Sequence, residues 1–184
     1  MREKMKALKR TLVFTFAFLM LLFTVSCKKD ISVPEGYKLA SNLDRVDYML
    51  FVPSDWIIKE SSTMTSAYVS ESDKTSISVI QRNKLDNEEA NAQWWYDNYY
   101  MSELKNSLGE DKITEKSSED FTLDTVAGKK FTFDIVLDGT TYNYIVVCVY
   151  TNASFYAVTY TSVGELFDKN MDDLNGILTN FKFD

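Results

Sequence analysis

Histidine is absent from this 184-residue chain. Imidazole is the commonest general base near neutral pH and the commonest nitrogen ligand for zinc, so its absence excludes histidine-dependent hydrolases and histidine-ligated zinc sites. Glycine is scarce as well: only six are present, and none forms a Gly-rich phosphate-binding loop. No set of residues specifies a reaction. We therefore expect no enzyme activity, no cofactor and no metal site.

Cysteine occurs only twice, at Cys27 and Cys148. The N-terminal pattern described below assigns Cys27 to a thioether, so we predict no disulfide. Cys148 lies within an apolar run, residues 144–150, which is typical of a central strand covered on both faces. We expect its thiol to be buried and inert.

Basic residues are few and unevenly placed. Five of the 20 Lys and Arg precede residue 27, together with one of the 27 Asp and Glu, so residues 27–184 carry 15 basic against 26 acidic groups, a formal net charge of −11. Such a domain repels phosphate backbones and anionic headgroups, so we expect no nucleic-acid partner. The composition, 45% hydrophobic and 26% charged, is that of one globular domain.

The N-terminus has the order of a secretory signal peptide. A basic segment, residues 1–10, precedes an apolar run over residues 11–25 and then the small residue Ser26. The run is shorter than the roughly 20 residues of a stable transmembrane helix, which disfavours the alternative of a permanent span. We predict a signal peptide over residues 1–26.

The tetrapeptide Thr24-Val25-Ser26-Cys27 resembles the lipobox of bacterial lipoproteins, although Thr24 stands where that pattern prefers Leu. The resemblance implies a diacylglyceryl anchor on the sulfur of Cys27 and a location on the outer face of the cell membrane. Two acyl chains suffice for stable anchoring. Cleavage without lipidation is the alternative. Residues 27–36 are then a lipidated tether, and residues 37–184 are the domain.

Strand signals dominate the start of the domain. Runs rich in β-branched and aromatic residues predict an antiparallel meander over residues 47–52, 65–70 and 75–81. A helix is predicted over residues 87–108, with Asp86 as its N-cap, Glu89 completing a capping box and Gly109 ending it.

Helical spacing gives this helix an expected core stripe of Ala90, Trp94, Met101, Leu104 and Leu108. Asp97 falls inside the stripe, either as a hydrogen-bonded carboxylate at a wet edge or as a functional buried acid. Four aromatic residues point away from the stripe: Trp95, Tyr96, Tyr99 and Tyr100. Aromatic side chains are preferred binding anchors, so these four are our candidate binding surface. Burial within the same domain is the alternative.

The C-terminal half reads as a strand ladder, with strands predicted over residues 121–126, 129–137, 141–151 and 155–161 and with turns at residues 127–128, 138–139 and 152–153. A second capping box, Ser162 with Glu165, predicts a helix that ends near Asn180 and packs through Val163, Phe167, Met171, Leu174 and Leu178. About seven strands and two main helices predict an α+β fold, an α/β/α sandwich around an antiparallel sheet.

Three segments resemble the Mog/PsbP superfamily, whose bacterial members include lipid-anchored DcrB-type proteins. They are residues 51–56, which end in a Pro-Ser-Asp-Trp turn, the hairpin over residues 126–130, and the final stretch from residues 156–160 to Phe181. The resemblance implies a PsbP-like α/β/α sandwich that binds or scaffolds macromolecules, as in plant relatives that assist the oxygen-evolving complex. Histidine metal sites of plant relatives cannot carry over.

We therefore expect an extracytoplasmic binding or assembly-accessory lipoprotein whose partner is an unknown protein or envelope component. Two other hypotheses stay open. A carboxylate-dependent envelope hydrolase that uses Asp97 needs a pocket in which two acidic groups converge. A metal-responsive extracytoplasmic sensor would use surface carboxylates instead.

Overall fold

The structure is a computed structural model that describes residues 31–59, 61, 64–86 and 90–184. The chain divides into two units, Met1–Ser32 and Val33–Asp184, and the described helices and strands belong to the second. The predicted signal peptide and Cys27 lie outside the described residues, so their assignment stays a prediction. None of the described helices has the length and hydropathy that a bilayer crossing needs.

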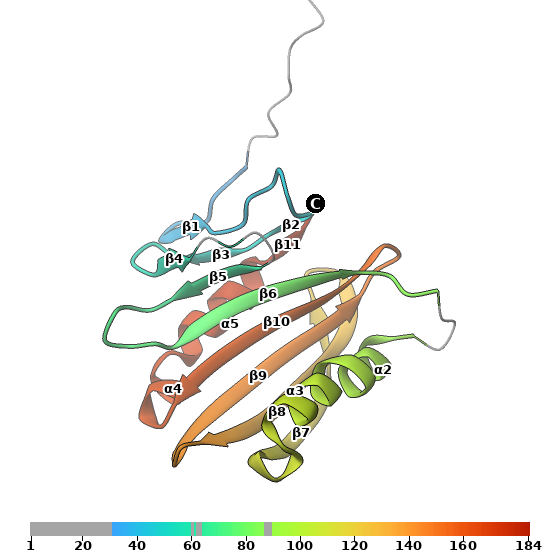
Figure 1. The fold of residues 1–184 in the computed structure, drawn as a ribbon. Helices are drawn as coiled ribbons and strands as arrows, with labels where there is room; N and C mark the ends of the chain where they lie inside the picture. Colours follow the sequence, from blue (N-terminus) through green and yellow to red (C-terminus); the bar gives the residue numbers. More distant parts are fainter. Residues whose placement is uncertain (1–30, 60, 62–63, 87–89) are drawn as a thin grey trace, which may run out of the picture. The chain divides into compact units, whose positions relative to one another are not determined.

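The centre of the domain is a seven-stranded antiparallel sheet with the order β4-β5-β6-β10-β9-β8-β7 (Figure 1). Its strands are β4 (Ile57–Lys59), β5 (Thr65–Tyr68), β6 (Ser76–Asn83), β7 (Ile113–Leu123), β8 (Val126–Leu137), β9 (Thr140–Tyr150) and β10 (Ser154–Val163). Two short sheets flank it: β1 (Tyr37–Leu39) with β3 (Phe51–Pro53), and β2 (Tyr48–Met49) with β11 (Lys182–Phe183).

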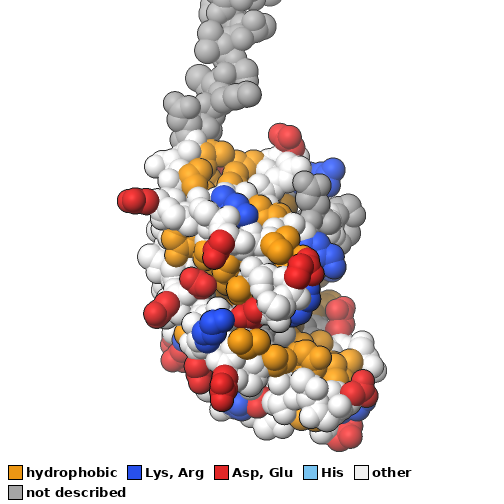
Figure 2. Space-filling view, turned by 90° about the vertical axis from the view of Figure 1, so that its left-hand side faces the viewer, with side chains coloured by type: hydrophobic (Ala, Val, Ile, Leu, Met, Phe, Trp, Pro, Cys, Tyr) orange, Lys and Arg blue, Asp and Glu red, His pale blue; other side chains and the backbone are white. Residues whose placement is uncertain are grey.

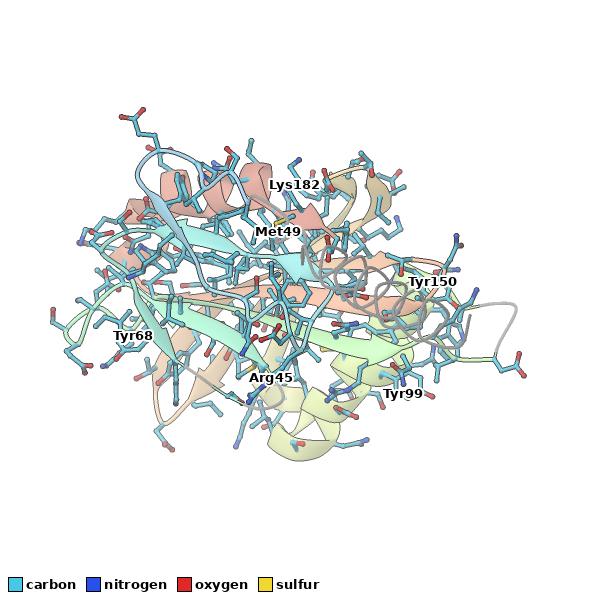
Figure 3. All side chains as sticks on the ribbon, turned by 90° about the horizontal axis from the view of Figure 1, so that it is seen from above. Arg45, Met49, Tyr68, Tyr99, Tyr150 and Lys182 are labelled. Carbon is cyan, nitrogen blue, oxygen red and sulfur yellow. The ribbon has the colours of Figure 1, made fainter. Side chains whose placement is uncertain are left out.

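Helices cover both faces of the sheet, which confirms the predicted sandwich (Figures 1 and 3). On one face lie α4 (Glu165–Lys169) and α5 (Met171–Asn180). On the other lies one helix in three parts: α2 (Ala92–Trp95), a π-helical turn (Tyr96–Met101) and α3 (Ser102–Leu108), followed by a short 3₁₀ turn (Glu110–Lys112). On the face shown in Figure 2, acidic, basic and hydrophobic side chains are intermixed.

The central strands β9 and β10 divide the core in two. On β9, Val147 and Val149 face α5, whereas Val146 and Cys148 face the π-helical turn. All four are fully buried, as the apolar run on both faces of this strand predicts.

One predicted turn is wrong. The chain reverses at Asp124 and Thr125, where Asp124 takes a positive φ of 55°, and not at residues 127–128. Gly128 lies inside β8, where a Cβ atom would come within 2.2 Å of the Cys148 carbonyl oxygen. This glycine therefore permits a close approach of two strands, whereas Asp138-Gly139 forms the predicted hairpin with both φ angles positive.

The second capping box is also wrong. Ser162 belongs to β10 and its hydroxyl bonds the Thr75 hydroxyl, while Gly164 occupies the N-cap of α4 without a side-chain bond. The predicted single helix is broken at Asn170, whose buried amide donates to the Asp73 carboxylate and to the Leu166 carbonyl. A polar network thus sets the junction of α4 and α5.

Candidate functional site

The first helix begins later than predicted. Asn91 is the N-cap, because its side-chain oxygen accepts from the Trp94 backbone N–H at 2.9 Å. Asp86 therefore does not cap this helix, and residues 87–89 lie outside the described part of the chain.

The π-helical turn explains where the predicted stripe fails. In an α-helix Met101 shares a face with the residue four positions earlier, Asp97, whereas the wider π turn places Tyr96, five positions earlier, on that face. Met101 and Tyr96 are accordingly buried, and Asp97 is exposed. The Asp97 carboxylate accepts two hydrogen bonds from the Gln93 amide at 2.9 Å. The interpretation of Asp97 as a buried acid is wrong.

Two of the four predicted surface aromatics are buried, so the predicted surface is wrong in that respect. Trp95 and Tyr96 are 5% and 1% exposed. Tyr96 stacks on Phe131 of β8 with ring centroids 3.6 Å apart, and Trp95 stacks on Phe155 of β10 at 5.5 Å. Periodicity alone placed them outward because it could not anticipate the one-residue shift of the π turn.

The other two aromatics reach the surface. Tyr99 is 40% exposed, and its ring lies outside the core, as Figure 3 shows. Tyr100 is half-buried, and its hydroxyl lies 3.0 Å from the Thr159 hydroxyl of β10. Burial raises the pKa of Tyr100 above its ordinary value, so this phenol is a neutral hydrogen-bonding group at neutral pH.

Three of the four candidates, Trp95, Tyr99 and Tyr100, line one groove of about 630 Å³ between the helix and the end of β6, here termed the aromatic groove. That volume lies within the usual range for small-molecule sites, roughly 300–1,000 Å³. The rest of its lining was not predicted: Ile80, Arg82, Asn83, Leu85, Glu103, Leu104 and Ser107. Strand alternation places Ile80 and Arg82 on one face of β6, but only the fold brings that face to the helix.

A second groove, of about 250 Å³, adjoins the first and shares Asn83 with it. We term it the polar groove; its lining is Asn42, Arg45, Val46, Ser61, Met64, Thr65, Gln81 and Asn83. Arg45 is its one described charged residue. The two grooves meet where β6 extends past β5. The pairing of the two strands reaches only to Thr65 opposite Val79, whereas β6 continues to Asn83.

Charged groups at the aromatic groove are unpaired among the described residues. Arg82 and Glu103 stand on opposite walls, one on β6 and one on α3, and both are exposed. Neither forms an ion pair with any residue that the structure describes. The one described hydrogen bond of the Arg82 side chain goes to the Gln81 carbonyl at 3.3 Å.

Cys148 and the carboxylates offer no reactive constellation within the described residues. Burial raises the pKa of the Cys148 thiol well above its ordinary value, which disfavours the nucleophilic thiolate. No group of three or more cysteine and acidic side chains in the described part of the chain is placed to hold a metal ion. The aromatic groove contains one described acid, Glu103.

Comparison with protein-family models and with curated protein sequences gives no match. Solved structures do match. Cyanobacterial PsbP (CyanoP) from Synechocystis sp. PCC 6803 has a TM-score of 0.63 at 10% identity, over 88% of this chain and 99% of that one. The Ran-binding protein Mog1p of Saccharomyces cerevisiae has a TM-score of 0.54 at 11% identity, and the match covers 83% of this chain and 96% of Mog1p. A Bacteroides thetaiotaomicron protein has a TM-score of 0.51 at 14% identity, and the match covers 82% of this chain but 49% of that protein. The chain therefore has the PsbP/Mog-like α+β fold that its sequence resembles.

Proposed function

We propose that this protein is a lipid-anchored binding or assembly-accessory protein on the outer face of a bacterial membrane, and that the aromatic groove receives its partner. The carrying observation is the groove itself: a concave site lined by Trp95, Tyr99 and Tyr100, with Arg82, which forms no ion pair with a described residue, in the same lining. Tryptophan, tyrosine and arginine are the residues most enriched at binding hot spots.

The anchor rests on sequence. The basic, apolar and small-residue order of residues 1–26, followed by Cys27, supports export and lipidation. Tyr37, the first residue of β1, follows Cys27 by ten positions, so an extended tether reaches at most about 36 Å. The β1 end of the domain would thus lie within that reach of the bilayer surface.

A protein or envelope partner fits the fold better than catalysis does. The similar structure of Mog1p carries the name of a Ran-binding protein, which supports partner binding as a use of this scaffold. The alternative of an envelope hydrolase requires two convergent acids, and Asp97 lies exposed against Gln93 instead. No observation favours the metal-responsive sensor.

The anchor is tested by feeding cells an alkyne-bearing fatty acid and isolating the protein. Wild-type protein should take up the label, and the Cys27→Ser variant should not. Intact-mass analysis of wild-type protein should show loss of residues 1–26 and a diacylglyceryl adduct. An unmodified Cys27, or an attached leader, would refute the anchoring.

The groove is tested by photo-crosslinking in intact cells, with a benzophenone amino acid at position 99. The matched control is position 136: Val136 is similarly exposed, at 43%, and lies on β8 next to the helix-facing Ile135, so it points from the opposite face of the sheet. A discrete adduct from position 99 that position 136 does not give supports the proposal. Identical products from both positions would refute it.

A further inference from the structure

The two arginines of the described chain both lie in the adjoining grooves, Arg82 in the aromatic groove and Arg45 in the polar groove. Seven lysines of the described chain form ion pairs, but neither arginine pairs with a described carboxylate. In a domain of net charge −11, two arginines that pair with no described carboxylate, in grooves that share Asn83, form a local exception. Arginine is the side chain best suited to bind carboxylate or phosphate in a bidentate manner.

Apolar side chains line the neighbouring part of the same groove. Ile80 and Leu85 lie on the strand side, and Leu104 and Trp95 lie on the helix side. All four are buried or half-buried, so this part of the groove is apolar, although Arg82 and Glu103 stand on the same two walls. A ligand here would remove apolar surface from water at about 25 cal/mol per Å².

The two linings together suit an amphiphile. The aromatic groove combines apolar and aromatic side chains with Arg82 and Asn83, and the polar groove, which shares Asn83, is lined mainly by amides, hydroxyls and Arg45. We propose, resting on the function proposed above, that the aromatic groove binds an anionic amphiphile. Its single apolar body lies against Leu85 and Leu104, and its carboxylate or phosphate head binds Arg82 with Arg45 beyond it.

Glu103 distinguishes this occupant from others. Its carboxylate lies on the helix wall and repels an anionic head, so it disfavours a head bound at α3 and favours one at the β6 end. A cationic or zwitterionic ligand would instead need Glu103. Neutralising Glu103 therefore strengthens or leaves unchanged the binding of an anion, and weakens that of a cation.

The experiment uses three probes with the same eight-carbon chain: octanoate, octylammonium and octanol. The protein is the unit of residues 33–184, whose described cores draw only on residues 37–183. Cooperative thermal unfolding of each variant confirms folding before titration calorimetry. We expect one-to-one binding of octanoate, roughly tenfold weaker binding of octanol and the weakest binding of octylammonium.

Single substitutions test whether Arg82 binds the anionic head of the ligand. Arg82→Gln should weaken octanoate binding roughly tenfold and leave octanol binding unchanged. Lys38→Gln is the matched control, because Lys38 of β1 pairs with no carboxylate that the structure describes and lines neither groove. Glu103→Gln should not weaken octanoate binding. Leu104→Asn should weaken octanoate and octanol alike.

Three results would overturn the inference: equal affinity for the three probes, preference for octylammonium, or an octanoate affinity unaffected by Arg82→Gln. Failure here is separable from failure of the proposed function. A position-99 crosslink to a protein, without octanoate binding, removes the amphiphile and keeps the binding function. Octanoate binding without any position-99 adduct in cells keeps the amphiphile site and removes the proposed partner contact.

Discussion

The ring of Tyr96 lies parallel to the ring of Phe131, with their planes 1° apart and their centroids separated by 3.6 Å. This contact joins the π-helical turn to β8 and fixes the helix on the sheet. It also sets the rotation of the helix, because burying Tyr96 turns Asp97 to solvent and leaves Tyr99 at the groove.

Tyr96→Ala should lower the free energy of unfolding by about 3–5 kcal/mol, because it removes a fully buried aromatic side chain. Asp97→Ala, one residue later, should change it by less than about 0.5 kcal/mol. Urea denaturation of both variants checks that Tyr96, and not Asp97, faces the sheet. Equal losses in the two would contradict the π-turn placement.

Gly128→Ala should destabilise the protein by about 1–3 kcal/mol or more, because the new methyl group meets the Cys148 carbonyl oxygen at 2.2 Å and the backbone of β9 must shift. The matched control is Gly176→Ala on α5, where the group encountered is the Tyr37 hydroxyl, the end of a movable side chain. Thermal unfolding compares the two. A Gly128→Ala variant as stable as wild type would show that the strands do not approach this closely.

Tyr150→Phe should stabilise the protein by up to about 1 kcal/mol. The Tyr150 hydroxyl is buried and has no hydrogen-bond partner among the residues that the structure describes, so removing it ends a desolvation cost without losing a bond. The stacking of its ring on Phe155, at 4.0 Å, remains. Tyr156→Phe is the contrast: that hydroxyl donates to Asp47 at 2.6 Å, and its loss should destabilise. Destabilisation by Tyr150→Phe, measured in urea, would imply a partner for this hydroxyl.

Asp73 should make stability fall in acid. Burial raises the pKa of Asp73, but hydrogen bonds from Thr75 and Asn170 outweigh it and hold the pKa below the ordinary 3.8. Because the pKa is lower in the folded state, the ionised Asp73 carboxylate stabilises the folded protein at pH values above the unfolded-state pKa of about 3.8. This contribution is lost as the pH falls from about 3.8 through the folded-state pKa.

The measurement for Asp73 is urea unfolding between pH 2 and 7. Asp73→Asn should cost about 1–3 kcal/mol at pH 7 and should flatten the acid limb of the profile. Asp172→Asn, at an exposed site on α5, should leave the profile unchanged. An unaltered acid limb in Asp73→Asn would assign the acid sensitivity to other groups.

Much of the fold was predictable because local signals agreed with it. The Asp138-Gly139 turn, the apolar run of β9 and the alternation of β8 depend on chirality, turn chemistry and period-two burial, all of which act between near neighbours. Two failures have a tertiary cause. Gly128 and Ser162 each have a local signal, but a close strand approach and a bond to Thr75 decided their roles. The third is local: Asn91 caps the first helix in place of Asp86.

The candidate site was half predictable. The helix sequence indicated an aromatic binding surface, and Tyr99 and Tyr100 do reach the groove. It did not indicate Arg82 or Leu85, because no spacing in a sequence relates the end of one strand to the side of a later helix. Only the packing of α3 beside β6 makes them neighbours.

The sequence by itself determined the sandwich, the central strands and the acidic balance of the domain, because these depend on composition and on periodicity along the chain. Tertiary structure alone decided the phase of the first helix and brought an apolar groove wall next to Arg82, which pairs with no described carboxylate. The physical reason is that periodicity along the chain does not signal a π turn, which depends on what it buries: the ring of Tyr96 against that of Phe131.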